Sequence, residues 1–212
     1  GLGDVYKRQI LVTTLGRLLG DELDKAGLAR AETGEWPGAL WKALEENGLT
    51  RALAPEAQGG AGASFEDVFA IVYAAGRACA PVPIGETLAA GWLCSVLGVA
   101  MPDGPLGLVP RESGGLRVVG TLDDATISGV ARHVPWGRFV RHLVVEAERD
   151  DGTSIIALVE TGGGQVEPSE NMAGEPRDTV TFDAAPIVTA KEQPAGMPRD
   201  IVRMLGALMR SA

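Results

Sequence analysis

The chain has few of the residues that build metal centres and disulfide frameworks. Its 212 residues include two cysteines and two histidines, which are too few and too dispersed for a zinc site. We therefore expect no metal. Cys79 and Cys94 fall within expected helices, and we interpret both as buried thiols rather than as a disulfide.

Long apolar runs and an excess of basic residues are also missing. Without a run of 18 apolar residues, no membrane-spanning segment is expected. Lys and Arg number 19 against 28 Asp and Glu, which gives a net charge of −9, whereas a surface for nucleic acid or anionic membrane needs clustered cations. With 45% hydrophobic residues, the composition predicts an acidic, globular, cytoplasmic protein with a real core.

The signatures of several enzyme classes do not occur in the sequence. No GxGxxG opens a helix, and the sequence holds no GxxxxGK[ST], GxSxG or HExxH. A nicotinamide enzyme of the Rossmann type is therefore not expected. A flavin bound by a β domain remains compatible with the sequence, because that fold does not use the dinucleotide fingerprint.

The chain is organised around a glycine-rich turn that leads into an apolar helix, over residues 55–86. Gly59, Gly60 and Gly62 allow a sharp turn or the close approach of another group. Ser64 is placed to cap the helix that follows, and acidic residues in the first turn favour its positive end. Large side chains recur every three or four positions, which predicts one buried face.

The same periodicity predicts the other helices of the chain. We expect helices over residues 11–28, 37–48, 65–79, 86–97 and 198–209. From residue 106 the period changes to two, which predicts short strands joined by turns. We expect strands over residues 106–109, 116–119, 126–128, 139–146, 154–159 and 179–182. Six strands within such a short stretch indicate an antiparallel sheet or small barrel.

The predicted fold class is therefore α+β. We expect an N-terminal all-helical domain over residues 10–103, a middle antiparallel β-barrel-like domain over 104–192, and the start of a C-terminal helical bundle over 193–212. Residues 1–9, GLGDVYKRQ, lack periodicity and we interpret them as a non-native leader. The last helix reaches the end of the sequence without a stop signal, which suggests a fragment.

Three stretches of this sequence resemble the acyl-CoA dehydrogenase family. They are the PEAQGGAG turn with its PVP exit, the SGVARHVPWGRFVRHLVVEAE segment, and the RDTVTFDAAPI strand. The resemblance implies the same order of helical, β and helical domains. It also implies FAD as cofactor, an acyl-CoA substrate that is dehydrogenated at its α and β carbons, and a homo- or hetero-oligomer. The family's catalytic carboxylate would lie beyond residue 212, so no catalytic residue is assigned here and the fragment by itself is expected to be inactive.

The resemblance also implies five cofactor-facing positions. His133, Val134 and Pro135 stand where the family has a flavin-contacting Trp-Ile-Thr run, and Trp136 follows them. Val109 stands where a threonine would precede a Gly-Ser-Asp stretch that this chain lacks. Pro135 has neither a hydroxyl nor an amide hydrogen, so a flavin hydrogen bond worth roughly 0.5 to 1.5 kcal/mol would be missing.

These departures leave alternatives open. The chain is either an active dehydrogenase, a non-catalytic structural subunit that completes a heteromer, or a flavin monooxygenase or oxidase on the same fold. For two residues the role is open as well. His133 either stacks on a flavin or lies in an exposed loop, and Trp136 either lines a cofactor pocket or anchors the start of a strand.

Overall fold

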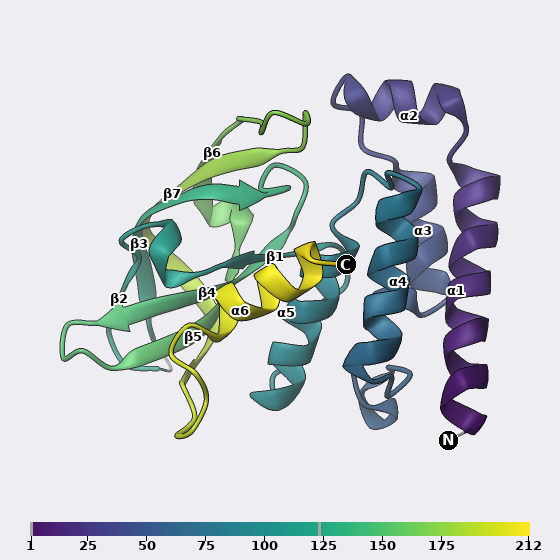
Figure 1. Ribbon diagram of the computed structural model, residues 1–212. Helices are drawn as coiled ribbons and strands as arrows, with labels where there is room; N and C mark the ends of the chain where they lie inside the picture. Colours follow the sequence, from purple (N-terminus) through teal and green to yellow (C-terminus); the bar gives the residue numbers. More distant parts are fainter. Residues whose placement is uncertain (1, 123) are drawn as a thin grey trace.

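The computed structural model describes residues 2–122 and 124–212, and it confirms the α+β class. Helices α1, α3 and α4 stand side by side, α2 crosses one end of them, and the strands form a separate β region (Figure 1). Helix α5 packs on β1 at the junction of these two parts, and α6 contacts both α5 and β1 (Figure 1). The helices are α1 (Leu2–Glu22), α2 (Lys25–Glu32), α3 (Gly38–Glu46), α4 (Phe65–Arg77), α5 (Ile84–Val96) and α6 (Ile201–Arg210). The strands are β1 (Leu106–Val109), β2 (Arg117–Val119), β3 (Thr126–Pro135), β4 (His142–Arg149), β5 (Ser154–Glu160), β6 (Gly164–Glu167) and β7 (Arg177–Glu192).

The start of α4 is a capping box, which confirms the predicted role of Ser64. The amide of Asp67 donates to Ser64 Oγ at 3.2 Å, and the amide of Ser64 donates to Asp67 Oδ2 at 3.1 Å. Two amides that the helix cannot pair internally are thereby satisfied.

The glycines before α4 serve both of the purposes expected of them. Gly59 and Gly62 have φ angles of 78° and 55°, in the left-handed region that glycine adopts without strain. A Cβ at Gly60 would lie 2.0 Å from the carbonyl oxygen of Ala54, so only glycine fits there unless the backbone moves.

The first helix differs from the one expected over residues 11–28. It begins at Leu2 and ends at Glu22, and a second helix starts at Lys25. The break arises because Asp24 is extended and its side chain accepts the amide of Gly27 at 2.6 Å, which makes Asp24 the cap of a new helix.

Residues 2–9, the described part of the predicted leader, also belong to this helix. Lys7 Nζ donates to the carbonyl of Ala61 at 2.8 Å, and Arg8 Nε donates to Asp67 Oδ1 at 2.9 Å. Residues 2–9 are therefore helical and joined to α4, contrary to the lack of pattern in their sequence. Their interpretation as a non-native segment stays a prediction.

The β region is a barrel closed by pairing of β4 with β5. Around the ring the order is β4, β2, β3, β7, β5 and back to β4, while β1 pairs with β4 and β6 with β7. Most pairs are antiparallel, as expected, but β1 and β2 both run parallel to β4. The alternating pattern could not show this, because it reports which face a side chain occupies and not the direction of the neighbouring strand.

Two strands are longer than expected and one was not expected. β3 and β7 extend well past the predicted cores at 126–128 and 179–182, and β6 forms in a glycine-rich segment that we assigned to a turn. β6 exists because the long β7 offers it a partner over Thr179–Phe182.

The buried side chains form two clusters. One contains the helices together with α6 and the faces of β1, β4 and β5 that α5 covers, and the other fills the barrel. Trp36 packs against both clusters. The domain boundaries at residues 103 and 192 stay predictions.

Candidate functional site

The end of β3 has an unusual backbone. His133 and Trp136 both have a φ of 57°, a conformation that bulky residues rarely adopt and that is often found at functional sites. The pairing of β3 with β7 shifts register between Ala131 and Val134. This irregularity decides which way each of the four residues from His133 to Trp136 faces.

His133 and Pro135 line a pocket of about 270 Å³ between the barrel and α6. The wall is made by residues from β1 and the segment after it, from β3, from the start of β7 and from α6. They are Leu108, Pro110, Ser113, His133, Pro135, Arg177, Val202, Arg203, Gly206 and Arg210. We call this the α6 pocket.

The other predicted site residues lie elsewhere. Val109 and Val134 are each 1% exposed and belong to the barrel core. Trp136 is buried against Phe139 and Trp36, with ring centroids 6.1 and 6.5 Å away. The structure thus brings two of the five predicted residues into one pocket. All five stay predictions as cofactor contacts.

Three arginines of the α6 pocket were not found from the sequence. Arg177 comes from β7, and Arg203 and Arg210 come from α6. They bring three guanidinium groups to the pocket lining in a chain whose net charge is −9, although Arg177 pairs with Glu175, and Arg203 with Glu112 and Asp200. Arg203 lies within the predicted amphipathic helix over residues 198–209, and Arg210 directly follows it and is the last residue of α6. Nothing in the sequence showed that this helix would face β3 and β7.

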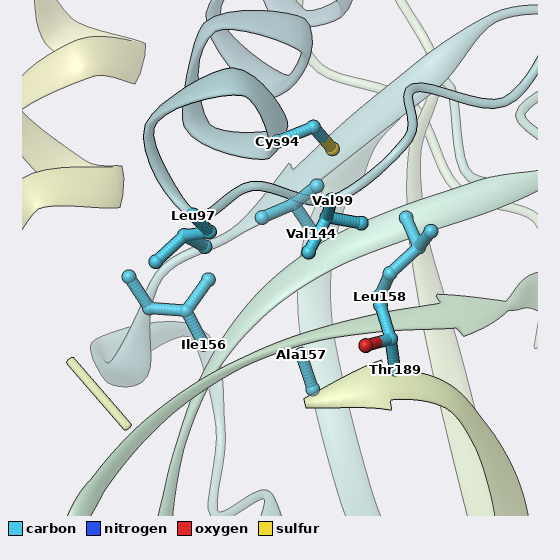
Figure 2. A pocket seen from close by; sticks show the side chains of 8 residues that line it. All are labelled: Cys94, Leu97, Val99, Val144, Ile156, Ala157, Leu158 and Thr189. Carbon is cyan, nitrogen blue, oxygen red and sulfur yellow. The ribbon is translucent and has the colours of Figure 1, made fainter. Parts of the chain in front are cut away.

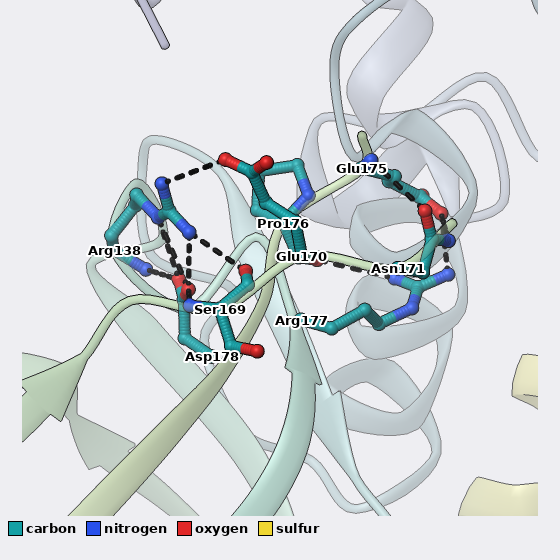
Figure 3. Close-up of polar contacts among 8 residues, drawn as sticks. All are labelled: Arg138, Ser169, Glu170, Asn171, Glu175, Pro176, Arg177 and Asp178. Atoms are coloured by element: carbon teal, nitrogen blue, oxygen red, sulfur yellow. Dashed lines mark hydrogen bonds and ion pairs between the residues drawn. The ribbon is translucent and has the colours of Figure 1, made fainter. Parts of the chain in front are cut away.

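Arg177 is held in place by a polar network on the segment that leads into β7 (Figure 3). Its Nη2 lies 2.5 Å from Glu175 Oε2, and Asn171 donates to the same carboxylate at 3.1 Å. Next to it, Asp178 is fully buried and accepts from the backbone amide and the guanidinium of Arg138. Of the residues drawn in Figure 3, Arg177 lines the α6 pocket, whereas Arg138, Glu170, Glu175 and Pro176 line a second, larger pocket.

A buried carboxyl lies near this edge. Glu86 in the first turn of α5 is 8% exposed. Burial raises its pKa; Glu175 acts in the same direction, while Arg177 and Arg210 oppose it. Two arginines of the α6 pocket, Arg177 and Arg210, therefore favour the charged form of Glu86 in α5.

A larger pocket of about 550 Å³ lies between the helices and the barrel, on the side of Trp136 and Phe139. Glu32, Glu35, Glu170 and Glu175 contribute to it. Cys79 also lines this pocket and is exposed, so the expectation that it is buried was wrong. It follows the end of α4 with a φ of 51°, where the chain has already left the packed face of the helix.

Cys94 is buried, as expected, at the contact between α5 and the sheet. It borders a crevice of about 10 Å³ whose apolar side chains come from the segment after α5, from β4 and from β5 (Figure 2). This volume is room for about one water molecule. Burial raises the pKa of the Cys94 thiol to about 11, so we assign it a packing role.

Two further searches concern the described residues only. No helix among them has the length and apolar character needed to cross a membrane. No three of their His, Cys, Asp and Glu side chains gather as a possible metal site.

Comparison with solved structures first identifies the fold. The chain is similar to a variant of the Tcur3481-Tcur3483 steroid ACAD, with a TM-score of 0.81 and 25% identity over 98% of this chain and 63% of that one. It is similar to the ChsE4-ChsE5 complex from Mycobacterium tuberculosis, with a TM-score of 0.70 and 20% identity over 95% and 59%. It is also similar to an acyl-CoA dehydrogenase complexed with FAD from Bacillus anthracis, with a TM-score of 0.68 and 17% identity over 97% and 40%. The fold is that of acyl-CoA dehydrogenases.

A family model also matches the N-terminal part of the sequence. Residues 7–99 match the family model described as "Acyl-CoA dehydrogenase, N-terminal domain". This match over residues 7–99, together with the fold, confirms the resemblance to the acyl-CoA dehydrogenase family seen in the sequence. It spans 63% or less of the length of the three similar structures. No curated protein matches the sequence.

Proposed function

We propose that this chain is part of a flavin-dependent acyl-CoA dehydrogenase that binds FAD in the α6 pocket and acts on an acyl-CoA thioester. The observation that carries this proposal is the pocket itself. It joins the β3 residues that correspond to the family's flavin-contacting run, His133 and Pro135, with three arginines from two other elements.

The residues of the α6 pocket suit a flavin. Its apolar members from β1 and β3 offer a wall for a planar ring system, and Ser113 and His133 offer hydrogen-bonding groups. The arginines supply positive charge for phosphate groups, which guanidinium binds well. Gly206 of α6 adds no side chain to the wall, and the Arg210 guanidinium lies beside it, 3.1 Å from where a Cβ would stand.

A bound flavin would accept a hydride equivalent from the substrate. The residues of this chain would bind and orient it. His133 presents an imidazole at the pocket. Pro135 also lines it, but its backbone nitrogen carries no hydrogen that could be donated to the flavin. The barrel and α6 together would exclude water from one side of the ring.

The test is a flavin assay on the purified protein. We expect a stoichiometric yellow flavin. Its bleaching by an acyl-CoA under anaerobic conditions is expected only for a chain that extends beyond residue 212 and supplies the catalytic carboxylate. Replacing Arg210 by Ala should weaken FAD binding by about tenfold, because a charge-assisted hydrogen bond contributes about 1.5 to 3 kcal/mol. Arg117→Ala, at an exposed position on β2 away from the pocket, is the matched control and should leave binding unchanged. A protein that binds flavin equally well with and without Arg210 would contradict the assignment of the pocket.

A second function is favoured by one specific residue. Pro135 removes a donor where the family has a flavin-contacting threonine, and two similar structures are named as pairs of different chains. We therefore propose, as the alternative, a non-catalytic subunit of a heteromeric acyl-CoA dehydrogenase. If flavin and turnover are found only after a partner chain is added, this alternative replaces the first proposal. Oxygen consumption without reduction of an artificial electron acceptor would instead indicate a flavin monooxygenase or oxidase.

A further inference from the structure

Glu146 is a buried carboxylate whose two oxygens are shared between two different elements. It lies in β4, opposite Ile156 of β5, and is 1% exposed. Its Oε1 accepts the backbone amide of Val202 at 3.0 Å, and its Oε2 accepts the backbone amide of Arg111 at 3.3 Å. Val202 belongs to α6, and Arg111 begins the short 3-10 helix η3 (Arg111–Ser113).

The bond to Val202 replaces a local helix cap. The first amides of a helix have no partner within the helix, and a residue just before the helix usually supplies one. Asp200 occupies that position in α6, yet its side chain makes no capping hydrogen bond. The carboxylate of Glu146, which is 56 positions away in the sequence, satisfies the helix instead and favours its positive end.

The two elements that Glu146 joins are two walls of the α6 pocket. Val202 lines the pocket from α6. Pro110 and Ser113 line it from the segment that contains Arg111. A single carboxylate thus holds both walls to the same point of the barrel.

The charged side chains near Glu146 have partners of their own. The guanidinium of Arg111 lies 2.5 Å from Glu148 Oε2, and it also donates to Ser154 at 2.8 Å. Arg203 of α6 pairs with Glu112 at 3.5 Å and with Asp200. Backbone amides are therefore the partners that remain for Glu146. Burial raises the pKa of its carboxyl, and the two backbone amides together with Arg111 oppose the rise.

We infer that Glu146 is the positioning residue that docks α6 and η3 on the barrel and so sets the shape of the α6 pocket. The link to flavin rests on the proposed function, whereas the docking of α6 does not. Removing one acceptor oxygen should loosen both walls without unfolding the barrel. Glutamine has the same size but offers only one oxygen, and its amide group would face a backbone N–H.

The test compares Glu146→Gln with Glu148→Gln in the purified protein. Glu148 lies two residues further along β4 and binds the Arg111 side chain, so it is a matched control on the same strand. Hydrogen exchange of the α6 and η3 amides is measured against that of the β5 and β7 amides, and FAD affinity is measured separately. In Glu146→Gln we expect the α6 amides, Val202 above all, to exchange about tenfold faster while the barrel amides are unchanged, and FAD affinity to fall at least threefold. Glu148→Gln should show neither effect.

Each outcome has a definite meaning. Faster α6 exchange with weaker FAD binding, in Glu146→Gln alone, supports the inference. Unchanged α6 exchange in Glu146→Gln overturns it, and so does faster exchange with undiminished FAD affinity. If the variant unfolds globally, Glu146→Asp is used, because its shorter carboxylate keeps the charge and fails to span the two amides; unchanged exchange there also overturns the inference. If the unmodified protein binds no FAD, the proposed function fails, and the exchange data still decide whether Glu146 docks α6.

Discussion

Two buried carboxylates, Glu146 and Asp178, are tied to donors from distant parts of the chain. Asp178 is fully buried and accepts the amides of Ser169 and Arg138 and the Arg138 guanidinium. Such a charge is tolerable only while its partners remain, because an unpaired charge in the interior is very costly. Loss of a buried carboxylate's partners, or of the carboxylate itself, should therefore be among the most destabilising changes in the molecule.

Asp178→Asn should be strongly destabilising. The side-chain amide would face donors that now meet a carboxylate, so we expect the free energy of unfolding to fall by about 3 to 5 kcal/mol. Urea denaturation measures this. The control is Glu170→Gln: the Glu170 side chain is 55% exposed and lies 3.6 Å from Arg138, so the loss there should stay below about 1 kcal/mol. Equal losses in the two variants would contradict the importance of burial.

Pro135→Thr should tighten flavin binding, on the proposed function. Threonine restores a hydroxyl and an amide hydrogen at a position that lines the pocket, and one hydrogen bond contributes roughly 0.5 to 1.5 kcal/mol. We expect FAD affinity to rise about twofold to tenfold, measured by fluorescence titration. Pro135→Val restores the amide hydrogen but no hydroxyl, and it separates the two donors. Loss of affinity in the threonine variant would show that the proline is itself part of the site.

At the scale of elements, helix α4 shows how local chemistry and long-range contacts meet. Ser64 and Asp67 cap each other within one turn. Asp67 also receives Arg8 from α1 at 2.9 Å. The first turn of α4 is thus both a helix start and the contact with α1.

Ser64→Ala should destabilise the protein by about 1 kcal/mol, the usual effect of removing an N-cap hydroxyl. Thermal unfolding measures it. Ser95→Ala is the control. Ser95 lies in the last turn of α5, and its hydroxyl makes only an exposed hydrogen bond to Gln58. A larger effect at Ser95 would argue against the capping box as the source of stability.

The contribution of Asp67 should depend on pH. Burial alone would raise its pKa, but hydrogen bonds from Arg8 and Ser64 outweigh burial and lower it. A pKa that is lower in the folded state gives stability that is complete above the unfolded value of about 3.9 and is lost as pH falls through the folded value. The difference in unfolding free energy between the unmodified protein and Asp67→Asn should therefore shrink as pH falls from about 5 to about 2. Asp183→Asn, at an exposed position, should show no such trend, and a difference independent of pH for Asp67 would refute the assignment.

At the scale of the whole molecule, one aromatic cluster joins the helices to the barrel. Trp36, just before α3, stacks on Phe139 at 5.3 Å and lies 5.7 Å from Trp41. It packs against both hydrophobic clusters. The cooperative behaviour of the two parts should depend on this residue.

Trp36→Ala should lower the free energy of unfolding by about 3 kcal/mol and broaden or split the unfolding transition, because a large aromatic side chain is lost from the contact between two cores. Calorimetry and circular dichroism of the helices and the barrel give the measurement. Trp92→Ala is a matched control, since Trp92 packs on Phe65 within the helical cluster alone; it should lower stability without separating the transitions. A single sharp transition in Trp36→Ala would contradict the bridging role.

The sequence by itself determined the features that depend on neighbours along the chain. The cap at Ser64, the turn at Gly59 to Gly62 and the change from helical to alternating periodicity near residue 106 are all local, so composition and spacing were enough to predict them. The motifs were enough to indicate the family, which the match over residues 7–99 confirms.

Only the tertiary structure decided the features that depend on contacts between distant residues. The parallel pairing of β4, the strand β6 and the meeting of α6 with β3 and β7 each require a partner far away in the sequence. The register shift before Val134 turned two of the predicted site residues away from the α6 pocket, since a shift by one residue exchanges the faces of a strand. The pairing of Glu146 with Val202 bridges 56 positions, and no local pattern can encode which amide a buried carboxylate will meet once the chain has folded.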